Sequence, residues 1–472
     1  MRKLMSRKID LTTGNIMKKL LIVAIPTLLS SIVQMTYNLT DMYWVGKVDS
    51  MGLSPTEAVA AIGTAGYYPW FGFGLILLVK IGTSVNVSHA AGRNDEEGVR
   101  VAGNTGLILM FALGLLYTIG GVFFTKQYVS LFNLQDQNVI TYSTDYLRIV
   151  TTFGLSYFLV NLFNGVYDGL GKTINTFIVT FSGLALNIIL DPLFILESIP
   201  FFGLTINGLG MGVRGAAIAT AISQTFILLI YLVIYVSKAR PFTINPIKSF
   251  SKKMMKKILK VGLPVGTQSI LFTSISIVLG IMIASYGKEV LATQRLGSQI
   301  EALAWMIASG FQVALASFVG QNFGAGQYDR IKDGYKEAMK LLVPYGIIIN
   351  LVLFFFAEQL FSIFIDEPET LKIGILYLRI LSISQLFMIV ELGTAGGFNG
   401  LGKTAIPSGV GITVNFLRIP GAIIFGTLIG YAGIWWVVSG TSIIKGVVLV
   451  TWFIITLRKV GKPNGIMFEN SN

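Results

Sequence analysis

The feature that most constrains the fold is a signature that occurs twice at the same spacing. Tyr146-Leu147-Arg148-Ile149 precedes Gly169-Leu170-Gly171-Lys172-Thr173, and Tyr377-Leu378-Arg379-Ile380 precedes Gly400-Leu401-Gly402-Lys403-Thr404. The offset between the copies is 377 − 146 = 231 at the start and 400 − 169 = 231 at the end. A mostly apolar stretch, long enough to cross a bilayer, separates the two parts of each signature. The sequence therefore predicts a duplicated membrane bundle, a plan that places a substrate path between the halves.

Composition agrees with a membrane protein. The 472 residues are 53% hydrophobic and 12% charged, whereas a soluble globular protein carries roughly twice that charged share. The chain has no cysteine, which excludes disulfides, thiolate metal sites and iron–sulfur clusters. The net charge of +13 comes from basic residues that border apolar segments. It therefore predicts an orientation in the membrane and no nucleic-acid partner.

Apolar length and helix-breaking residues predict an all-α polytopic fold of twelve spans. The expected ranges are 18–46, 58–90, 100–124, 140–169, 174–196, 211–237, 258–286, 289–324, 334–357, 371–401, 405–429 and 433–457. They form two six-helix lobes, 1–237 and 258–472, joined by a basic linker over 238–257. Lysines cluster at the end of this linker, so we expect a surface helix there on the inner leaflet, at Lys252, Lys253, Lys256 and Lys257.

The distribution of basic residues predicts the orientation of the chain. Most of them lie near both ends of the chain and in the loops that join even spans to odd ones. The opposite loops carry only Lys47, Lys126, Lys288 and Lys372. Because positively charged loops stay on the cytoplasmic side, both termini are predicted to be cytoplasmic in a multi-pass protein of the cell membrane.

A glycine-rich run and the single histidine suggest phosphate binding and catalysis, but both have simpler explanations. The run from Gly397 to Thr404 matches the phosphate-loop pattern, but that mechanism needs a strand before the loop, and the other copy has Val166 at the first glycine. The glycines are expected to end a membrane helix instead. His89, the single histidine, lies where a span meets a charged loop, and we expect it to be solvated. The sequence predicts no enzyme and no cofactor.

Acids inside the predicted spans are the main candidates for function. Asp41 lies in the first span, and Asp191 lies in the fifth, where Asn187 shares its helix face. Asn161 and Asn164 likewise share a face of the fourth span. A carboxylate in hydrocarbon is costly unless it is paired, hydrated or protonated, so such residues are functional candidates by default. The alternative is that both acids lie near span ends and are hydrated.

The second half lacks these acids. Aligning the copies puts Ile419 opposite Asp191, so the acidic cavity is expected in the first half. Glu301 and Glu391 remain in the second half, with Arg295 and Arg418 as intramembrane partners. Structural ion pairs and a second site are both open interpretations of these charges.

Several short elements, taken in order, resemble the multidrug and toxic compound extrusion family, MATE, over essentially the whole chain. They are Asn38-Leu39-Thr40-Asp41 with Val45-Gly46-Lys47, Ala91-Gly92-Arg93, Asp168 to Thr173, Asn187 to Ile195, Gly215 to Thr220, and Gln321 to Gly326. The acidic first half is similar to the DinF-like branch of that family.

The resemblance implies a V-shaped pair of six-helix lobes that exports amphipathic, often cationic drugs in exchange for protons or sodium ions. It implies an ion-coupling cluster of Asp41, Asn187, Asp191 and Thr220, in which the first three are suited to hold Na⁺. It also implies a substrate cavity lined by Gln34, Tyr37, Asn38, Asn161, Asn164 and Asp168. The segment from Glu197 to Gly212 is longer than usual for the family, and we expect an outer loop there.

A flippase or exporter of a lipid-linked precursor is the alternative function, because related proteins share the two-lobe plan. It would need cations that face the central cavity, for which Arg295 and Arg418 are candidates. The expected partners are small amphipathic drugs and the lipid bilayer, and the chain is expected to act as a monomer.

Overall fold

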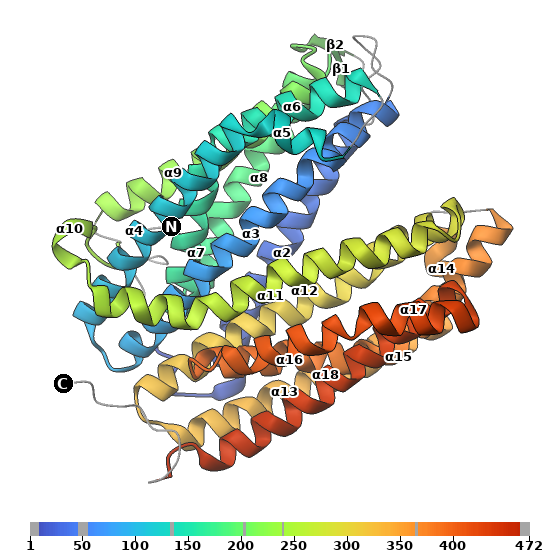
Figure 1. The fold of residues 1–472 in the computed structure, drawn as a ribbon. Coiled ribbons are helices and arrows are strands. Elements are labelled where there is room, and N and C mark those ends of the chain that lie inside the picture. The colour runs from blue at the N-terminus through green and yellow to red at the C-terminus, as the bar shows by residue number, and fades with distance from the viewer. Residues whose placement is uncertain are drawn as a thin grey trace.

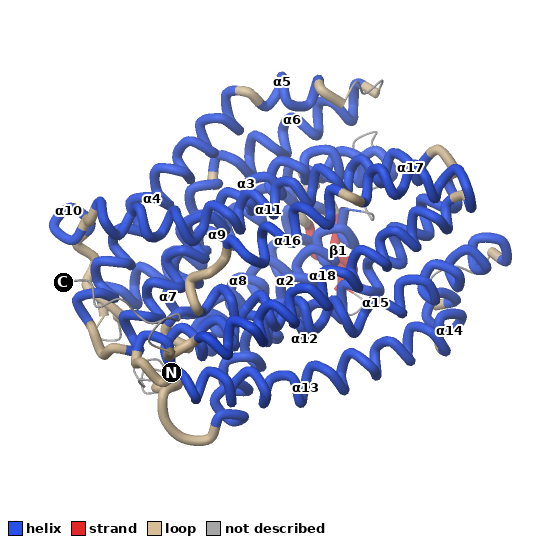
Figure 2. Tube along the Cα trace, turned by 60° about the horizontal axis from the view of Figure 1, so that its bottom comes forward, coloured by secondary structure: helices blue, strands red, loops and turns tan. Residues whose placement is uncertain are grey.

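The computed structural model describes residues 9–45, 55–132, 136–201, 204–237, 240–363 and 367–462, and nearly all of them are helical (Figure 2). Among the described residues, eleven helical segments are long and apolar enough to cross a membrane, one of them (Ala405–Ile429) interrupted at a single residue, and a pair of shorter helices that meet at 50° forms a further span. The prediction of twelve spans is therefore confirmed, and the chain is a multi-pass membrane protein.

The first lobe contains α2 to α9 and the second lobe contains α11 to α18 (Figure 1). The first lobe consists of α2 (Ile16–Val45), α3 (Pro55–Gly92), α4 (Glu96–Phe123), α5 (Thr125–Ser130), α6 (Gln137–Thr152), α7 (Gly154–Gly169), α8 (Thr173–Ile195) and α9 (Gly212–Val236). The second lobe consists of α11 (Lys252–Ala284), α12 (Lys288–Gly324), α13 (Tyr328–Phe355), α14 (Ala357–Ser362), α15 (Pro368–Gly400), α16 (Ala405–Phe416), α17 (Arg418–Ile429) and α18 (Tyr431–Lys459). The short helix α10 (Pro246–Ser249) lies in the connection between them.

Both copies of the duplicated signature end a helix in the same way. Gly171 and Gly402 have φ of 69° and 70°, a left-handed conformation that glycine adopts without strain. The Lys172 N–H donates to the Tyr167 carbonyl at 2.8 Å, and the Lys403 N–H makes the matching bond at 2.9 Å. These bonds satisfy carbonyls at the ends of α7 and α15. A helix precedes each glycine run, so the phosphate-loop match is incidental, as predicted.

The two lobes differ in where their helices break. Phe153 separates α6 from α7, which meet at 50°. The equivalent helix α15 is continuous, and it carries Gln385 at the position of Gly154, since 154 + 231 = 385. Glycine costs a helix roughly 1 kcal/mol relative to alanine, and Gly154 stands directly after the break in the first lobe. In the second lobe a single residue, Leu417, interrupts the helix between α16 and α17, and the two together form one span.

Two connections differ from the expectation. The segment 197–212 contains a hairpin of β1 (Ser198–Phe201) and β2 (Leu204–Asn207), so the fold carries a small sheet beside its helices. The basic residues 252–257 form the first turns of α11 and not a separate surface helix. The Ser251 side chain caps that helix by accepting from the Met254 N–H at 3.2 Å, and no helix breaker separates these turns from the span.

The lobes meet along α2 and α3 of the first and α11 and α12 of the second, and they diverge toward one end of the molecule (Figure 1). Small residues permit the close approach, because Gly82 packs on the Ile258 carbonyl and Gly262 packs on the Leu78 carbonyl. We call the end at which the described chain begins and ends, at residues 9 and 462, the terminal end of the molecule, and the other the distal end.

Residues before α2 cross from the first lobe onto the second at the terminal end. Leu11 is fully buried. Its N–H donates to Gln321 Oε1 at 3.2 Å, and its carbonyl accepts from Asn322 Nδ2 at 3.2 Å. Arg330 donates to the Gly14 carbonyl at 2.8 Å. Hydrogen bonds between the lobes therefore hold the terminal end closed.

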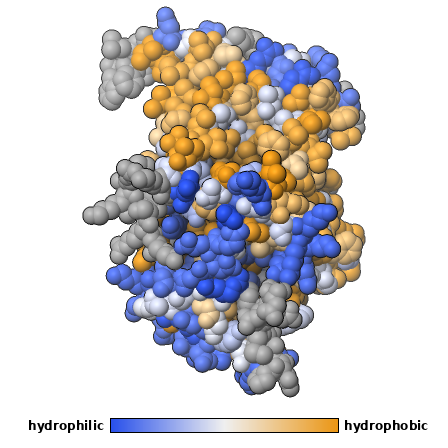
Figure 3. Space-filling model, turned by 90° about the vertical axis from the view of Figure 1, so that its left-hand side faces the viewer, coloured by the Kyte–Doolittle hydropathy of each residue, from blue (hydrophilic) through white to orange (hydrophobic). Residues whose placement is uncertain are grey.

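The surface agrees with a protein surrounded by lipid. Figure 3, which faces the side with the terminal end, shows hydrophilic residues over its centre and lower part and a broad hydrophobic surface above. Large apolar side chains such as Leu116, Leu229 and Val233 are exposed on the outer faces of their helices. In a bilayer these side chains contact acyl chains.

Candidate functional site

Asn187 and Asp191 form a fully buried polar pair on α8. Neither residue is exposed, and Asn187 Nδ2 donates to Asp191 Oδ1 at 2.8 Å. Their spacing of four residues puts them on one helix face, as predicted. Pro192 follows inside the same helix and has no N–H to donate, so the Ile188 carbonyl loses its usual helical partner. A buried carboxyl beside a weakened helix turn is suited to respond to a proton or a cation.

The helices α2 and α9 bring further predicted residues toward α8. The Tyr37 hydroxyl of α2 donates to the Thr220 carbonyl of α9 at 3.4 Å. Tyr37 also packs with Val33 of α2 and Leu184 of α8. The structure thus brings Tyr37, Thr220 and the α8 helix together.

The remaining predicted residues on α2 lie along one face of that helix. Gln34 is exposed. Asn38 follows Gln34 by four residues, and Asp41 follows Tyr37 by four residues, which is the spacing of one helix face. The side chains of Asn38 and Asp41 lie outside the described part of the structure. The role predicted for Asp41, including its part in a sodium site, therefore stays a prediction.

Asn161 and Asn164 lie in a second polar group, on α7. The Tyr231 hydroxyl of α9 donates to Asn164 Oδ1 at 2.5 Å, and Asn161 Nδ2 donates to the Tyr157 carbonyl at 3.0 Å. Tyr167 stacks on Tyr231 with ring centroids 5.8 Å apart. Asn161 and Asn164 are each 8% exposed, so the interior of the first lobe carries amide and tyrosine groups at this level.

Asp168 lies in α7 near the terminal end of the molecule, and its side chain is paired with a lysine. Its carboxylate is 3.8 Å from Lys80 Nζ of α3. Its carbonyl accepts from the Ser317 hydroxyl of the second lobe at 2.5 Å. Asp168 therefore joins the two lobes as well as facing the first-lobe interior. The sequence interpretation did not single out Lys80, although a lysine within an apolar run is itself a signal.

The second lobe buries a group of four charged residues. Lys445 Nζ of α18 lies 3.2 Å from the Glu391 carboxylate of α15. Arg418 donates to the Thr441 and Ser442 hydroxyls at 2.9 and 3.0 Å.

Glu301 completes this group and is 2% exposed. Arg295 is exposed on α12, and no ion pair to it is found among the described residues, so its interpretation as an intramembrane partner stays a prediction. The sequence interpretation also missed Lys445, which is the cation that contacts Glu391. Lys445 lies against an acid and Arg418 against hydroxyls, whereas the buried Glu301 Oε1 has no hydrogen-bond partner among the described residues. Structural ion pairs and a second site are both compatible with these contacts.

His89 joins the lobes, which differs from the solvated position that the sequence led us to expect. Its Nε2 lies 2.7 Å from the Gly400 carbonyl of α15, and its ring lies 5.3 Å from that of Phe323. The charged loop after α3 is close to His89 in sequence. The second lobe nevertheless packs against His89 and covers its ring.

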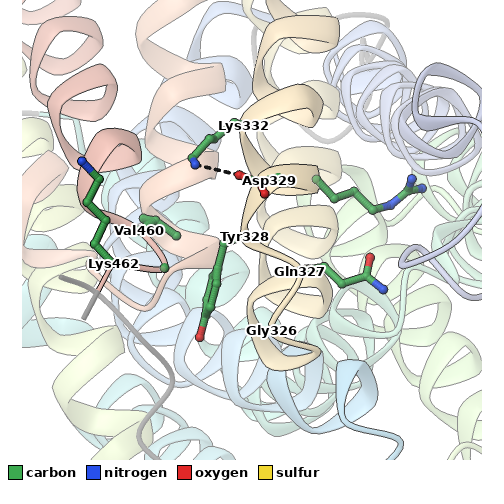
Figure 4. A pocket seen from close by; sticks show the side chains of 9 residues that line it. Gly326, Gln327, Tyr328, Asp329, Lys332, Val460 and Lys462 are labelled. Carbon is green, nitrogen blue, oxygen red and sulfur yellow. Dashed lines mark hydrogen bonds and ion pairs between the residues drawn. The ribbon is translucent and has the colours of Figure 1, made fainter. Parts of the chain in front are cut away.

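A pocket of about 340 Å³ lies at the terminal end of the second lobe (Figure 4). Gly326 and Gln327 line it from the connection before α13, Tyr328 lines it from the start of α13, and Val460 and Lys462 line it from the residues after α18. Lys332 and Asp329 pair with each other at 2.8 Å in this pocket. Its position separates it from the buried polar residues of the first lobe.

Carboxyl and amide oxygens are the ligands available for a cation in the first lobe. Within the described ranges, no group of three or more His, Cys, Asp or Glu residues is arranged to hold a metal ion. Oxygen donors of this kind suit a proton or a hard cation such as Na⁺.

Known proteins resemble this chain over both lobes. The model of the MatE family matches residues 26–193 and 264–424, one match in each lobe. The probable multidrug resistance protein NorM of Thermotoga maritima is 24% identical over 397 residues, covering 83% of this chain and 82% of that protein. The multidrug export protein MepA of Staphylococcus haemolyticus is 22% identical over 431 residues, covering 90% of each.

Solved structures share the fold. A transporter of the MOP superfamily from Pyrococcus furiosus has a TM-score of 0.86 at 23% identity, and the match covers 97% of this chain and 99% of that one. The outward-facing conformation of a multidrug resistance MATE family transporter matches with the same score, identity and coverage. The two-lobe, twelve-span architecture predicted from the sequence is thus confirmed, whereas the predicted branch within the family stays a prediction.

Proposed function

Because the chain belongs to the MatE family, we propose that it is a secondary transporter that exports small amphipathic drugs, often cationic, in exchange for protons or sodium ions. The names of its relatives as multidrug resistance and multidrug export proteins support this substrate class. The observation that carries the proposal is the fully buried Asn187–Asp191 pair inside the first lobe. A buried acid inside a membrane span is suited to bind an ion and is a functional candidate by default.

Competition for the first lobe couples the two flows. A charged Asp191, together with Asp41, attracts a cationic drug, and a bound proton or sodium ion removes that attraction. Each cargo therefore weakens the binding of the other by the same factor. Tyr37 and the amides Asn161 and Asn164 offer aromatic and polar contacts to the drug. The Asp168 carboxylate is paired with Lys80, so Asp168 contributes to the cavity as part of an ion pair.

Alternating access follows from the contacts between the lobes. The lobes touch near the terminal end and diverge at the distal end (Figure 1). Opening toward the terminal end requires the bonds of Leu11, His89 and Ser317 to break. Pro26 and Pro192 interrupt the backbone bonding of α2 and α8, so a change of charge in the first lobe can alter how these helices bend.

The flippase alternative gains no support from the buried cations. Arg418 and Lys445 lie against hydroxyls and an acid, whereas binding of a pyrophosphate headgroup needs cations without such partners. Arg295, the other cation named for the flippase, is exposed on α12, so the preference for the drug exporter rests on the names of the relatives. Since one chain holds both lobes, the monomer is the proposed functional unit in the bilayer of the cell membrane.

Fluorescent dye export tests the proposed function. Cells that express the chain should retain less of a cationic dye than cells with an empty vector, and collapsing the ion gradients should remove the difference. Equal dye retention in the two strains, with the protein present in the membrane, would contradict the proposal.

The proposed orientation places both termini and the terminal end in the cytoplasm. The chain has no cysteine, so single cysteines report their own side of the membrane. We expect Glu358→Cys, at an exposed position of α14 at the distal end, to react with an impermeant thiol reagent added to intact cells. Lys253→Cys, at the terminal end of α11, should react only after the cells are opened. The reverse labelling pattern would show that the orientation is wrong.

A further inference from the structure

A groove of about 690 Å³ lies between α5 and α6 at the distal end of the first lobe. Figure 1 shows these two helices side by side, away from the chain termini. The groove is lined by Lys126, Val129, Ser130, Gln137, Ile140, Thr141, Thr144, Asp145 and Arg148. It is separate from the Asn187–Asp191 pair, and the proposed transport does not use it.

The charges in this groove favour an anion. Lys126 and Arg148 are exposed in it, and no ion pair to either is found within the described ranges. The one acid that lines the groove, Asp145, accepts from Arg214 Nε at 2.8 Å and Nη2 at 2.5 Å. Its charge is therefore already balanced, and the groove keeps the charges of two cations.

The hydroxyl groups of the groove contribute less to anion binding than the two cations do. Ser130, Thr141 and Thr144 each donate to a carbonyl of their own helix. The available donors are therefore the two cations and the Gln137 amide. The positive charge of the two cations, and not a set of neutral hydrogen-bond donors, therefore determines which ligand this groove can bind.

Apolar side chains next to the groove favour a lipid as the source of an anion. Phe123, Phe124 and Leu131 flank α5 and are 71%, 61% and 76% exposed. Leu116 and Ile119 continue this exposed apolar surface along α4. Acyl chains lying against α4 would place a lipid phosphate at the level of α5, where a span meets water.

The second lobe provides a natural comparison. Its helix α14 corresponds to α5, and Glu358 stands there where α5 has Lys126. Arg379 corresponds to Arg148, since 148 + 231 = 379, and its guanidinium lies over the Phe354 ring at 5.8 Å. The duplicated architecture therefore does not itself require a cation at the position of Lys126, since the second lobe carries an acid there.

We propose that the groove between α5 and α6 binds the phosphate of an anionic phospholipid in the leaflet at the distal end. Lys126 and Arg148 hold the phosphate, and the apolar surface of α4 contacts the acyl chains. Bound in this way, the lipid anchors the α5–α6 corner of the first lobe at the membrane surface.

Titration of the purified full-length chain with phosphatidylglycerol, read out by native mass spectrometry, tests this proposal. The variant Lys126→Gln should bind the lipid about fivefold more weakly, and Lys126→Gln/Arg148→Gln about thirtyfold more weakly. The matched variant Lys372→Gln/Arg379→Gln in the second lobe should bind as the wild type does. Thermal stability in phosphatidylcholine shows that each variant is folded.

Two outcomes would overturn the proposal. Wild-type affinity for phosphatidylglycerol in the double first-lobe variant would show that the lipid binds elsewhere. Inorganic phosphate that displaces the lipid, and stabilises the wild type as well as the lipid does, would assign the groove to a free anion and not to a lipid.

Discussion

Asp191→Asn is expected to reduce dye export by at least about a hundredfold, since it removes the charge on which the proposed coupling depends. The asparagine can still accept the hydrogen bond that Asn187 Nδ2 now donates at 2.8 Å, so the variant should fold and reach the membrane. Export of a cationic dye from cells, normalised to the amount of protein in the membrane, measures the effect. Asp41→Asn should act in the same direction.

Asp145→Asn is the matched control for this prediction. It also removes an acid of the first lobe, but one that pairs with Arg214 near the surface. It should export dye at nearly the wild-type rate, because an exposed ion pair contributes only ~0–1 kcal/mol. If Asp191→Asn exported dye as fast as Asp145→Asn under the same gradient, the buried pair would have no role in coupling.

Lys445→Met is expected to lower the stability of the folded protein by roughly 3–5 kcal/mol, because it leaves the Glu391 carboxylate buried without its cation. The two side chains are 3.2 Å apart and only 8% and 10% exposed. The double variant Lys445→Met/Glu391→Met should recover most of the loss, since it removes both charges. Denaturant unfolding in detergent, followed by tryptophan fluorescence, measures these differences.

Lys340→Met provides the comparison for a surface pair. Lys340 contacts Glu337 at 2.5 Å, but it is 66% exposed, so its loss should cost less than about 1 kcal/mol. A similar, small loss for Lys445→Met would mean that water reaches the Glu391–Lys445 pair. The second lobe would then contain a hydrated site in place of a structural ion pair.

The span pattern could be predicted from the sequence because it depends on apolar length and on helix-breaking residues, which are both local features. Each predicted span overlaps a helix or a bent helix pair of the structure. The helix ends at Gly171 and Gly402 were also predictable, since glycine favours the left-handed conformation found there. The hairpin of β1 and β2 was not, because its four-residue strands carry too little pattern to identify.

Contacts within one helix were predictable, and contacts between distant helices were not. The shared face of Asn187 and Asp191 follows from a spacing of four residues. The hydrogen bond between Tyr231 and Asn164 joins residues 67 positions apart, and no local sequence pattern predicts it. His89 was placed in water for the same reason, since the Gly400 carbonyl that it contacts lies 311 positions away.

Lys80 and Lys445 were predictable but missed. Each interrupts a long apolar run, and a charge inside a span is a candidate for function or pairing. Their partners Asp168 and Glu391 were both noted, so a search for a cation able to meet each buried acid would have found the two lysines.

Transport by the purified chain in liposomes, with no ATP present, tests the central claim most directly. A pH gradient and a sodium gradient are imposed separately, and the movement of a cationic dye is recorded. The account predicts that at least one gradient drives the wild type to move dye against its own gradient, and that Asp191→Asn abolishes this movement. Absence of uphill dye movement under both gradients, with the protein folded in the liposomes, would contradict it.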